Sequence, residues 1–236
     1  MLVHHVFRAP LGAAAHKVHQ RAMGIENHPH LFGLRERFTV SSAPADDEAL
    51  IDIAQQIAGV APDLTQFDAQ VAAAFMLFSA HPADLVLLET GMGGRDDSTN
   101  VIARPALSVI TPIALDHQDA LGPRLEDIAA HKAGIIKPGA PAIIARQENA
   151  AREIIEATAE RIGAPLFRHG VEWDAYANAG RLVVRTEARA LDLPLPALTG
   201  VHQIDNAGLA CAAMMQWRDF SDDAIAQGIA NASWPA

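Results

Sequence analysis

Three polar groups stand where the sequence predicts the ends of buried strands. Glu89 ends the apolar run of residues 85–88, and Asp116 and His117 follow the apolar run of residues 106–113. The carboxyl ends of parallel strands meet at one edge of a sheet, where ligands bind in open α/β folds. A carboxylate and an imidazole suit a hard cation such as Mg²⁺, which takes few protein ligands beside phosphate oxygens and water. These residue types therefore indicate a metal site at that edge.

Lys132 lies on the apolar face of a helix predicted over residues 124–132. Leu125, Ile128, Ala129 and Lys132 recur at the spacing of one helical face. A lysine on a buried face has to extend its ammonium to water, pair with an acid or lose its charge.

A glycine-rich stretch follows Glu89. Gly91, Gly93 and Gly94 allow the backbone to pass close to a bound phosphate or metal, although their spacing is not that of the dinucleotide-binding fingerprint. Arg95 and Asp97 add charge beside them.

Each of these features also has a purely structural interpretation. Glu89 can be the partner of a turn or a salt bridge, His117 a surface residue, and Lys132 a residue whose ammonium reaches water. The glycines can form a tight turn in which Arg95 and Asp97 pair with each other.

The composition limits the classes of protein. A formal net charge of -10 over 236 residues argues against a nucleic-acid binder, which needs a basic face. The one cysteine, Cys211, fits a reducing compartment and a small core residue. The first residues do not have the pattern of a signal peptide, and no stretch approaches the roughly 20 apolar residues of a membrane span. We therefore expect a cytoplasmic protein.

The order of predicted elements indicates an α/β fold with a mainly parallel sheet flanked by helices. Short apolar runs bounded by glycine and proline alternate with segments of helical periodicity. The predicted helices are residues 46–58, 67–80, 124–132, 151–163 and 205–217. The predicted strands are residues 85–88, 106–113, 141–145, 166–173 and 181–187, and residues 194–200 are expected to form a proline-rich turn.

Several segments, taken together, are similar to one known family. VLLETGMGGRDDSTNVI, SVITPIALDHQDALG and HKAGIIKPGAP resemble the folylpolyglutamate synthase/dihydrofolate synthase family of the Mur ligase superfamily. LTGVHQIDNAGLA, GIANASWP and HPHL resemble further elements of that family, so the likeness spans roughly residues 28 to 235. It implies a Mur ligase central domain over residues 28–236, without a C-terminal domain, after a divergent N-terminus of residues 1–27.

The resemblance implies an ATP-dependent amide ligase. ATP would phosphorylate a folate or dihydropteroate carboxylate, and the amino group of L-glutamate would attack the acyl phosphate. The implied cofactors are ATP and Mg²⁺, and the implied partners are these small molecules, with no nucleic acid, no membrane and a monomeric chain. The implied metal-binding and catalytic residues are Glu89, His117 and a carbamylated Lys132. The implied nucleotide-binding residues are Asn206, Gly91, Gly93 and Gly94, and the implied substrate-binding residues are His30, Arg95 and Asp97.

The sequence departs from the family at both ends. The family's phosphate-binding loop has no counterpart, because no Gly-Lys-Ser or Gly-Lys-Thr occurs, and the serine of the Ser-Pro-His-Leu element is His28. We therefore expect this chain to bind ATP weakly and to ligate poorly. A truncated or frame-shifted ligase and a non-catalytic paralogue that binds metal, nucleotide or pterin are both compatible with this pattern. A metal-dependent hydrolase using Glu89, Asp116 and His117 would need more ligands than the sequence offers.

Overall fold

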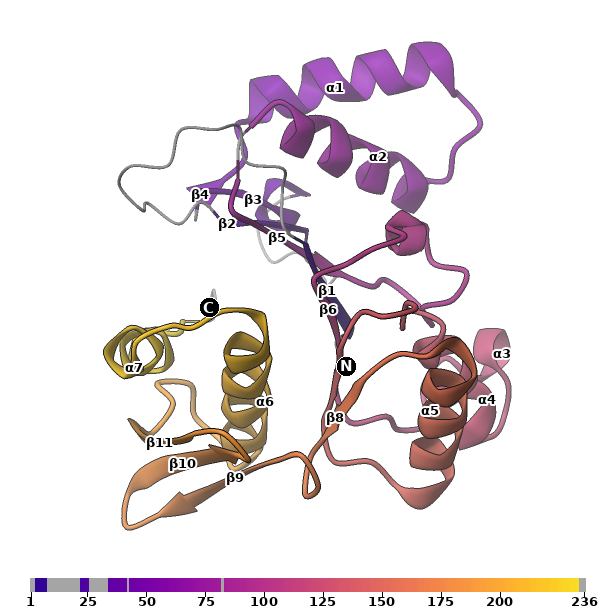
Figure 1. Ribbon diagram of the computed structural model, residues 1–236. Coiled ribbons are helices and arrows are strands. Elements are labelled where there is room, and N and C mark those ends of the chain that lie inside the picture. Colours follow the sequence, from indigo (N-terminus) through magenta and orange to yellow (C-terminus); the bar gives the residue numbers. More distant parts are fainter. Residues whose placement is uncertain (1–2, 8–21, 26–33, 42, 82, 234–236) are drawn as a thin grey trace. The chain divides into compact units, whose positions relative to one another are not determined.

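The computed structural model divides into two compact units, residues 2–106 and residues 107–236, called here the N-terminal unit and the C-terminal unit (Figure 1). Both units combine strands with helices, so the predicted α/β class is confirmed. The structure describes residues 3–7, 22–25, 34–41, 43–81 and 83–233.

The N-terminal unit contains a mixed sheet organised around the predicted strand that ends at Glu89. This strand, β5, pairs in parallel with β2 and antiparallel with β1, while β3 and β4 extend the sheet beyond β2 by antiparallel pairing. The sheet is therefore less purely parallel here than the sequence predicts. In sheet order the strands are β4 (Ala43–Pro44), β3 (Phe38–Val40), β2 (Ala22–Ile25), β5 (Leu85–Glu89) and β1 (Val3–Phe7).

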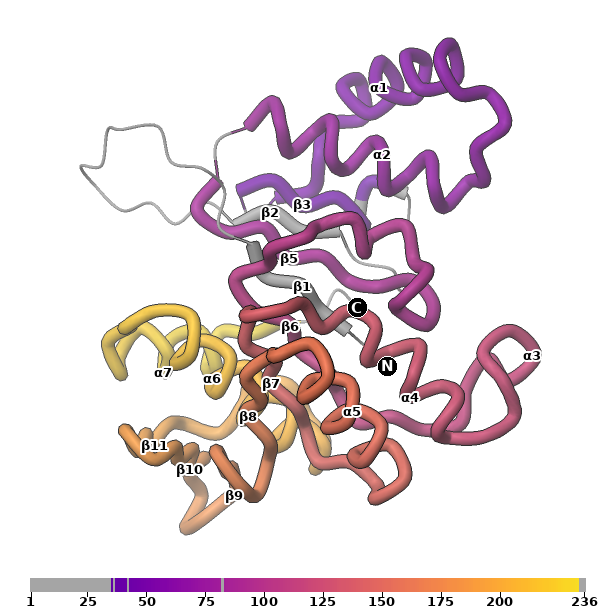
Figure 2. The backbone as a smooth tube through the Cα atoms, turned by 45° about the vertical axis from the view of Figure 1, so that its right-hand side comes forward, coloured from indigo at the N-terminus to yellow at the C-terminus, as the bar shows by residue number. Residues whose placement is uncertain are grey.

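Two helices, α1 (Asp47–Val60) and α2 (Gln66–Ser79), lie side by side in this unit (Figures 1 and 2). Each begins at a side-chain cap: the carboxylate of Asp46 and the hydroxyl of Thr65 accept the N–H of the residue three positions later, both at 3.1 Å. Leu77 and other residues of α2 pack into the core with Leu88 of β5. Both helices were predicted from periodicity and are confirmed. Two short 3₁₀ turns, η1 (Leu34–Arg37) and η2 (Ser98–Val101), complete the unit.

The C-terminal unit contains the parallel strands that the apolar runs predict. β6 (Leu107–Ile110), β7 (Ala142–Ile144) and β8 (Leu166–Arg168) pair in this order, and every residue of β6 and β7 is buried. Helices α4 and α5 pack together on one side of these strands, and α6 lies on the other (Figures 1 and 2). Coverage on both faces explains why the strand sequences are continuously apolar. The helices are α3 (Gln118–Leu121), α4 (Leu125–Ala133), α5 (Asn149–Ile162), α6 (His202–Trp217) and α7 (Asp222–Ala230).

A three-stranded antiparallel sheet in this unit was not fully predicted. It consists of β9 (Trp173–Asn178), β10 (Arg181–Thr186) and β11 (Ala190–Pro194), and α6 packs against β9 and β10. The single strand predicted over residues 166–173 is wrong, because a turn at Gly170, whose φ is 79°, separates β8 from β9. β11 precedes the expected proline-rich turn and reaches its first proline.

Arg168 connects three segments of the C-terminal unit through charged hydrogen bonds. From the end of β8, its guanidinium donates to Glu156 of α5 at 2.7 Å and to both carboxylate oxygens of Glu172, at 2.6 and 3.1 Å. Burial alone raises the pKa of Glu172, but the hydrogen bonds from Arg168 outweigh it, so the pKa lies below its ordinary value of 4.5. The guanidinium thus joins the edge of the parallel sheet to α5 and to the turn before β9.

Replacing Arg168 by methionine is expected to destabilise the protein by about 1.5–3 kcal/mol, because two partly buried carboxylates lose charged hydrogen bonds. The same change at Arg181, whose pair with Asp192 is exposed, should cost about 0.2–1 kcal/mol or less. Urea unfolding at neutral pH measures both values, and equal costs would contradict the assignment.

The cost of the Arg168→Met change also depends on pH. Since the pKa of Glu172 is lowered in the folded protein, its contribution is complete above 4.5 and disappears as the pH falls through the folded value. The difference in stability between the variant and the unchanged protein should therefore narrow below pH 4.5. A difference that grew on acidification would contradict this account.

Candidate functional site

Glu89 is the last residue of β5 and is buried, with 6% of its surface exposed. The next residue, Thr90, is equally buried, and its hydroxyl oxygen has no hydrogen-bond partner among the described residues. An apolar strand therefore ends in two oxygen-bearing side chains that are shielded from water. Carboxylate and hydroxyl oxygens are hard ligands of the kind that Mg²⁺ prefers.

The loop after β5 is organised around the carboxylate of Asp97. One oxygen accepts the N–H groups of Gly91 and Met92, at 3.0 and 2.9 Å. The other accepts the N–H and the hydroxyl of Thr99, at 2.9 and 2.5 Å. Both oxygens are therefore engaged in holding residues 91–99 in one conformation.

Arg95 does not pair with Asp97, the alternative that the sequence left open. Its guanidinium donates to the neighbouring Asp96 at 3.1 Å, and both of these side chains are more than half exposed. The carboxylate of Asp97 faces the loop backbone instead. The proposed pair is wrong because the loop turns the two side chains to different surroundings.

Glycine is required at these loop positions for two separate structural reasons. Gly93 and Gly94 have φ angles of 69° and 152°, which side chains rarely tolerate. A Cβ atom on Gly91 would lie 2.5 Å from the ring of Phe67, so this glycine allows α2 and the loop to come close together. The sequence had suggested only that these glycines bring backbone near a ligand.

A second carboxylate, that of Asp68, fastens the loop to α2. It accepts the hydroxyl of Thr65 at 2.6 Å and the hydroxyl of Ser98 through a short hydrogen bond. These two bonds, with that of Ser98 the stronger influence, hold the pKa of Asp68 below its ordinary value. The role of this residue was not predicted, although Thr65 followed by an acid three positions later is a recognisable helix-start pattern.

His117 adopts an unusual backbone conformation in the C-terminal unit. It precedes α3 with φ 50° and ψ 36°, the left-handed region, which non-glycine residues occupy in only a few per cent of cases. Its N–H donates to the carboxylate of Asp116 at 2.9 Å, and its ring Nε2 lies 3.7 Å from that carboxylate. Both side chains are about half exposed. Histidine is among the residue types enriched in this region, and backbone conformations of this kind cluster at functional positions.

Lys132 lies in the last turn of α4 and is buried, with 6% of its surface exposed. Ile128 and Ala129 on the same face are fully buried, as the helical spacing predicted. The lysine therefore belongs to the packed face of α4.

The structure places the remaining predicted residues as follows. Asn206 is exposed on α6, where its side-chain amide donates to Gln203 at 3.1 Å. His30 lies outside the described residues. Glu89 and the loop from Gly91 to Asp97 come together in the N-terminal unit, whereas His117, Lys132 and Asn206 belong to the C-terminal unit. Within the described ranges, no three His, Cys, Asp or Glu side chains gather as a metal-binding group.

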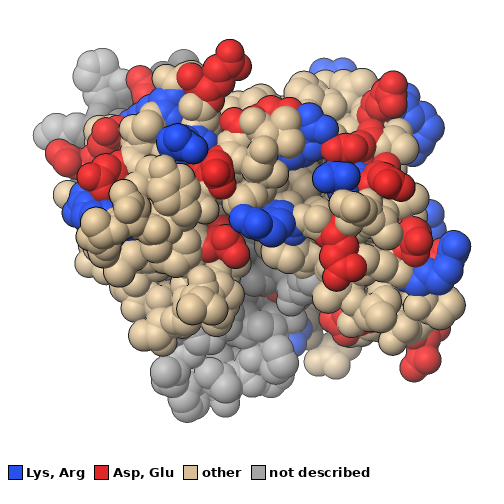
Figure 3. Space-filling view, turned by 90° about the horizontal axis from the view of Figure 1, so that it is seen from below, with Lys and Arg blue, Asp and Glu red and all other residues tan. Residues whose placement is uncertain are grey.

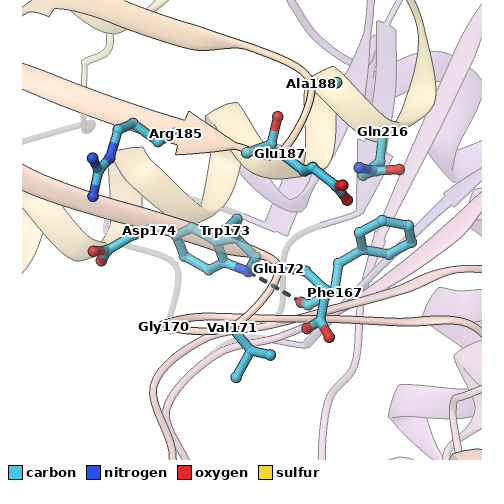
Figure 4. A pocket seen from close by; sticks show the side chains of 11 residues that line it. Phe167, Gly170, Val171, Glu172, Trp173, Asp174, Arg185, Glu187, Ala188 and Gln216 are labelled. Carbon is cyan, nitrogen blue, oxygen red and sulfur yellow. Dashed lines mark hydrogen bonds between the residues drawn. The ribbon is translucent and has the colours of Figure 1, made fainter.

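A hollow of about 760 Å³ in the C-terminal unit contains none of the predicted site residues (Figure 4). The indole of Trp173, which donates to the carbonyl of Phe167 at 3.0 Å, forms one wall. Its charged lining comprises three acids and one arginine: Glu172, Asp174, Glu187 and Arg185. Because this lining is mainly acidic, the hollow is poorly suited to phosphate groups or carboxylate substrates.

Surface charge and hydropathy add two observations. On the face shown in Figure 3, basic and acidic side chains lie interspersed. No helix in the described part of the chain is both long enough and apolar enough to cross a membrane.

Comparison with known proteins identifies relatives of this chain. The family model described as the Mur ligase middle domain matches residues 49–214. A dihydrofolate synthase/folylpolyglutamate synthase of Bacillus subtilis is 33% identical over 237 residues, which are 90% of this chain and 54% of the relative.

Solved structures give the same result. The complex of E. coli FolC with DHPP and ADP has a TM-score of 0.83 and 34% identity, covering 92% of this chain and 51% of that one. A bifunctional folylpolyglutamate synthase/dihydrofolate synthase with Mn, AMPPNP and L-glutamate bound has a TM-score of 0.81 and 32% identity, covering 92% and 52%. The chain thus spans about half the length of the relatives that it matches.

Replacing Asp97 by alanine is expected to release the loop, because four backbone or hydroxyl groups lose their acceptor. Thermolysin cleaves before exposed apolar residues, and Met92 in this loop is 48% exposed. We expect cleavage before Met92 to accelerate by roughly tenfold or more, since about 1.4 kcal/mol of lost local stability corresponds to a tenfold change.

The matched control is Asp96→Ala, which alters an exposed neighbour that pairs with Arg95 and should leave the cleavage rate nearly unchanged. Equal cleavage of the two variants would show that Asp97 does not hold the loop.

Proposed function

The chain belongs to the Mur ligase middle domain family, and on that basis we propose that it is the central part of an ATP-dependent amide ligase of the folylpolyglutamate synthase/dihydrofolate synthase type. One observation carries this proposal: the likeness over 92% of the chain to a structure in complex with DHPP and ADP. The match includes the glycine loop after Glu89 and the segments containing His117 and Lys132, all of which lie within residues 49–214.

The proposed reaction has two steps. A carboxylate oxygen of a folate or dihydropteroate substrate attacks the γ-phosphorus of ATP, and ADP leaves. The amino nitrogen of L-glutamate then attacks the carbonyl carbon of the acyl phosphate, inorganic phosphate leaves, and the amine loses a proton. Such reactions are accelerated mainly by positioning the reactants and by stabilising phosphate charge.

Glu89 and His117 are the proposed protein ligands of Mg²⁺. Bound Mg²⁺ would supply charge stabilisation for the phosphate oxygens. The buried carboxylate of Glu89 beside the orphan hydroxyl of Thr90 supports the first assignment. The left-handed backbone of His117 supports the second, because strain of this kind is retained where a side chain has to be aimed.

Lys132 is the proposed site of carbamylation. Its amine would add carbon dioxide to form a carbamate, which replaces a positive group by a carboxylate-like group that can bind metal. The burial of Lys132 on the packed face of α4 supports this assignment, because a lysine removed from water is the kind whose amine is modified in this way.

The loop residues have proposed roles in binding. Gly91, Gly93 and Gly94 bring backbone close to the nucleotide. Arg95, whose exposed side chain forms a surface ion pair with Asp96, contacts substrate. Asp97 contributes by holding the loop rather than by binding substrate, since both of its oxygens are already used. Asn206 as a nucleotide-binding residue and His30 as a substrate-binding residue rest on the resemblance.

The proposal includes a cytoplasmic, monomeric protein with small-molecule partners.

Burial raises the pKa of the Cys211 thiol to about 12, so this thiol is unreactive and suited to a core position.

Ligation is tested with the pure chain at high concentration, by measuring ADP release and the glutamylated product. Product formation should be slow, as the departures from the family imply, and should require ATP, Mg²⁺, L-glutamate and a pteroate or folate substrate together. Glu89→Gln should lower the rate by roughly 100-fold or more, as loss of a group that stabilises developing charge does. The control Glu153→Gln changes an exposed residue of α5 and should have no effect. ADP release that ignores glutamate, or an unaffected Glu89→Gln variant, would contradict the proposal.

Carbamylation is tested separately by carbon-13 NMR in labelled bicarbonate. Lys17, Lys132 and Lys137 are the lysines of the chain, so few signals compete. Because burial lowers the pKa of Lys137, its amine is a candidate for the same reaction and Lys137→Arg is the matched control. We expect a carbamate signal that disappears in Lys132→Arg and persists in Lys137→Arg. The opposite pattern would move the modification to Lys137.

A further inference from the structure

The side chain of Gln147 joins the segment that leads from β6 to His117 to the loop before α5. Its amide nitrogen donates to the carbonyl of Thr111 at 2.9 Å, and its amide oxygen accepts the N–H of Ile113 at 3.0 Å. We call this pair of hydrogen bonds the Gln147 bridge. It spans 36 and 34 positions in sequence, so it is a tertiary contact.

The Gln147 bridge adds hydrogen bonds between the chain after β6 and the chain after β7, just beyond the point where the two strands stop pairing. The N–H of Ala145 donates to the carbonyl of Ile110 at 2.9 Å at the end of β6. Pro112 follows two residues later and has no N–H to donate. The side-chain amide of Gln147 donates to the carbonyl before this proline and accepts the N–H after it. A residue of an adjacent parallel strand would make the same pair of bonds.

We propose that Gln147 is a positioning residue that fixes the approach of the chain to His117. Ile113, which is held by the bridge and buried, lies four residues before His117. The intervening residues are exposed and belong to no helix or strand. Because His117 has a strained backbone, its orientation depends on how the preceding segment is held. The role of this orientation in metal binding rests on the proposed function.

Amide hydrogen exchange tests the bridge without any ligand. Gln147→Met keeps the length of the side chain and removes both hydrogen bonds, whereas Gln147→Glu keeps an acceptor for Ile113 and loses the donor to Thr111. We expect exchange of the Ile113 amide to rise by roughly tenfold in Gln147→Met and by less in Gln147→Glu. The control Glu148→Gln alters an exposed neighbour that makes no side-chain cap at α5 and should leave the rate unchanged.

Metal binding tests the positioning role. Mn²⁺ bound to the pure chain is measured by electron paramagnetic resonance together with the melting temperature. We expect Gln147→Met to raise the Kd for Mn²⁺ by roughly tenfold, the scale on which residues that orient a metal ligand act. The melting temperature should change no more than that of a typical surface variant. A lowered melting temperature with an unchanged Kd would reduce Gln147 to a structural residue and overturn the proposal.

The two measurements separate the possible failures. Unchanged exchange at Ile113 in Gln147→Met would overturn the bridge itself. Absence of Mn²⁺ binding by the unaltered chain would instead overturn the metal role proposed for His117, and the exchange of Ile113 would still decide on the bridge.

Discussion

Backbone N–H and C=O groups just beyond the end of a strand no longer have hydrogen-bond partners in the sheet and need other partners. This constraint shapes the loops after both β5 and β6. After β5, the carboxylate of Asp97 accepts two successive N–H groups of the loop. After β6, the amide of Gln147 both donates and accepts. The chemistry of each side chain matches the backbone groups that it pairs. A carboxylate can only accept, which suits a turn that exposes N–H groups, whereas an amide can serve an extended segment that offers both kinds of group.

This constraint explains why residues with no proposed contact to substrate matter to the site. Glu89 is placed by the strand itself, because it is the last residue of β5 and shares its burial. Arg95 and His117 lie beyond the ordered strands, and their positions depend on side chains that hold the chain. Asp68 extends the same arrangement to α2 through its bond with Ser98. The side chains that hold each loop therefore matter to the proposed site as much as the residues proposed to bind metal or substrate.

The sequence was most informative where periodicity is strong. The helices around Ile57 and Leu77, and the burial of Lys132 on α4, follow from a 3.6-residue repeat that tertiary contacts reinforce. The β9–β11 sheet was predicted only in part, because the turn at Gly170 lies inside a stretch that was expected to form one strand. The bond of Asp97 to Thr99 is a local cap at the start of η2, but its bonds to Gly91 and Met92 depend on loop dihedral angles. The role of Gln147 depends on residues more than 30 positions away and has no local pattern.

Loss of the ion pairs of Arg168 and loss of the hydrogen bonds of Gln147 should affect different properties of the protein. Arg168 binds carboxylates on α5 and on the turn before β9, so its contribution belongs to the stability of the whole C-terminal unit. Gln147 bonds a segment whose middle is exposed and irregular, so its contribution belongs to local order. Local opening of a loop costs less free energy than global unfolding. A chain of this kind can therefore keep its fold while losing the orientation of His117, and for that reason stability alone is a poor measure of the intactness of the proposed site.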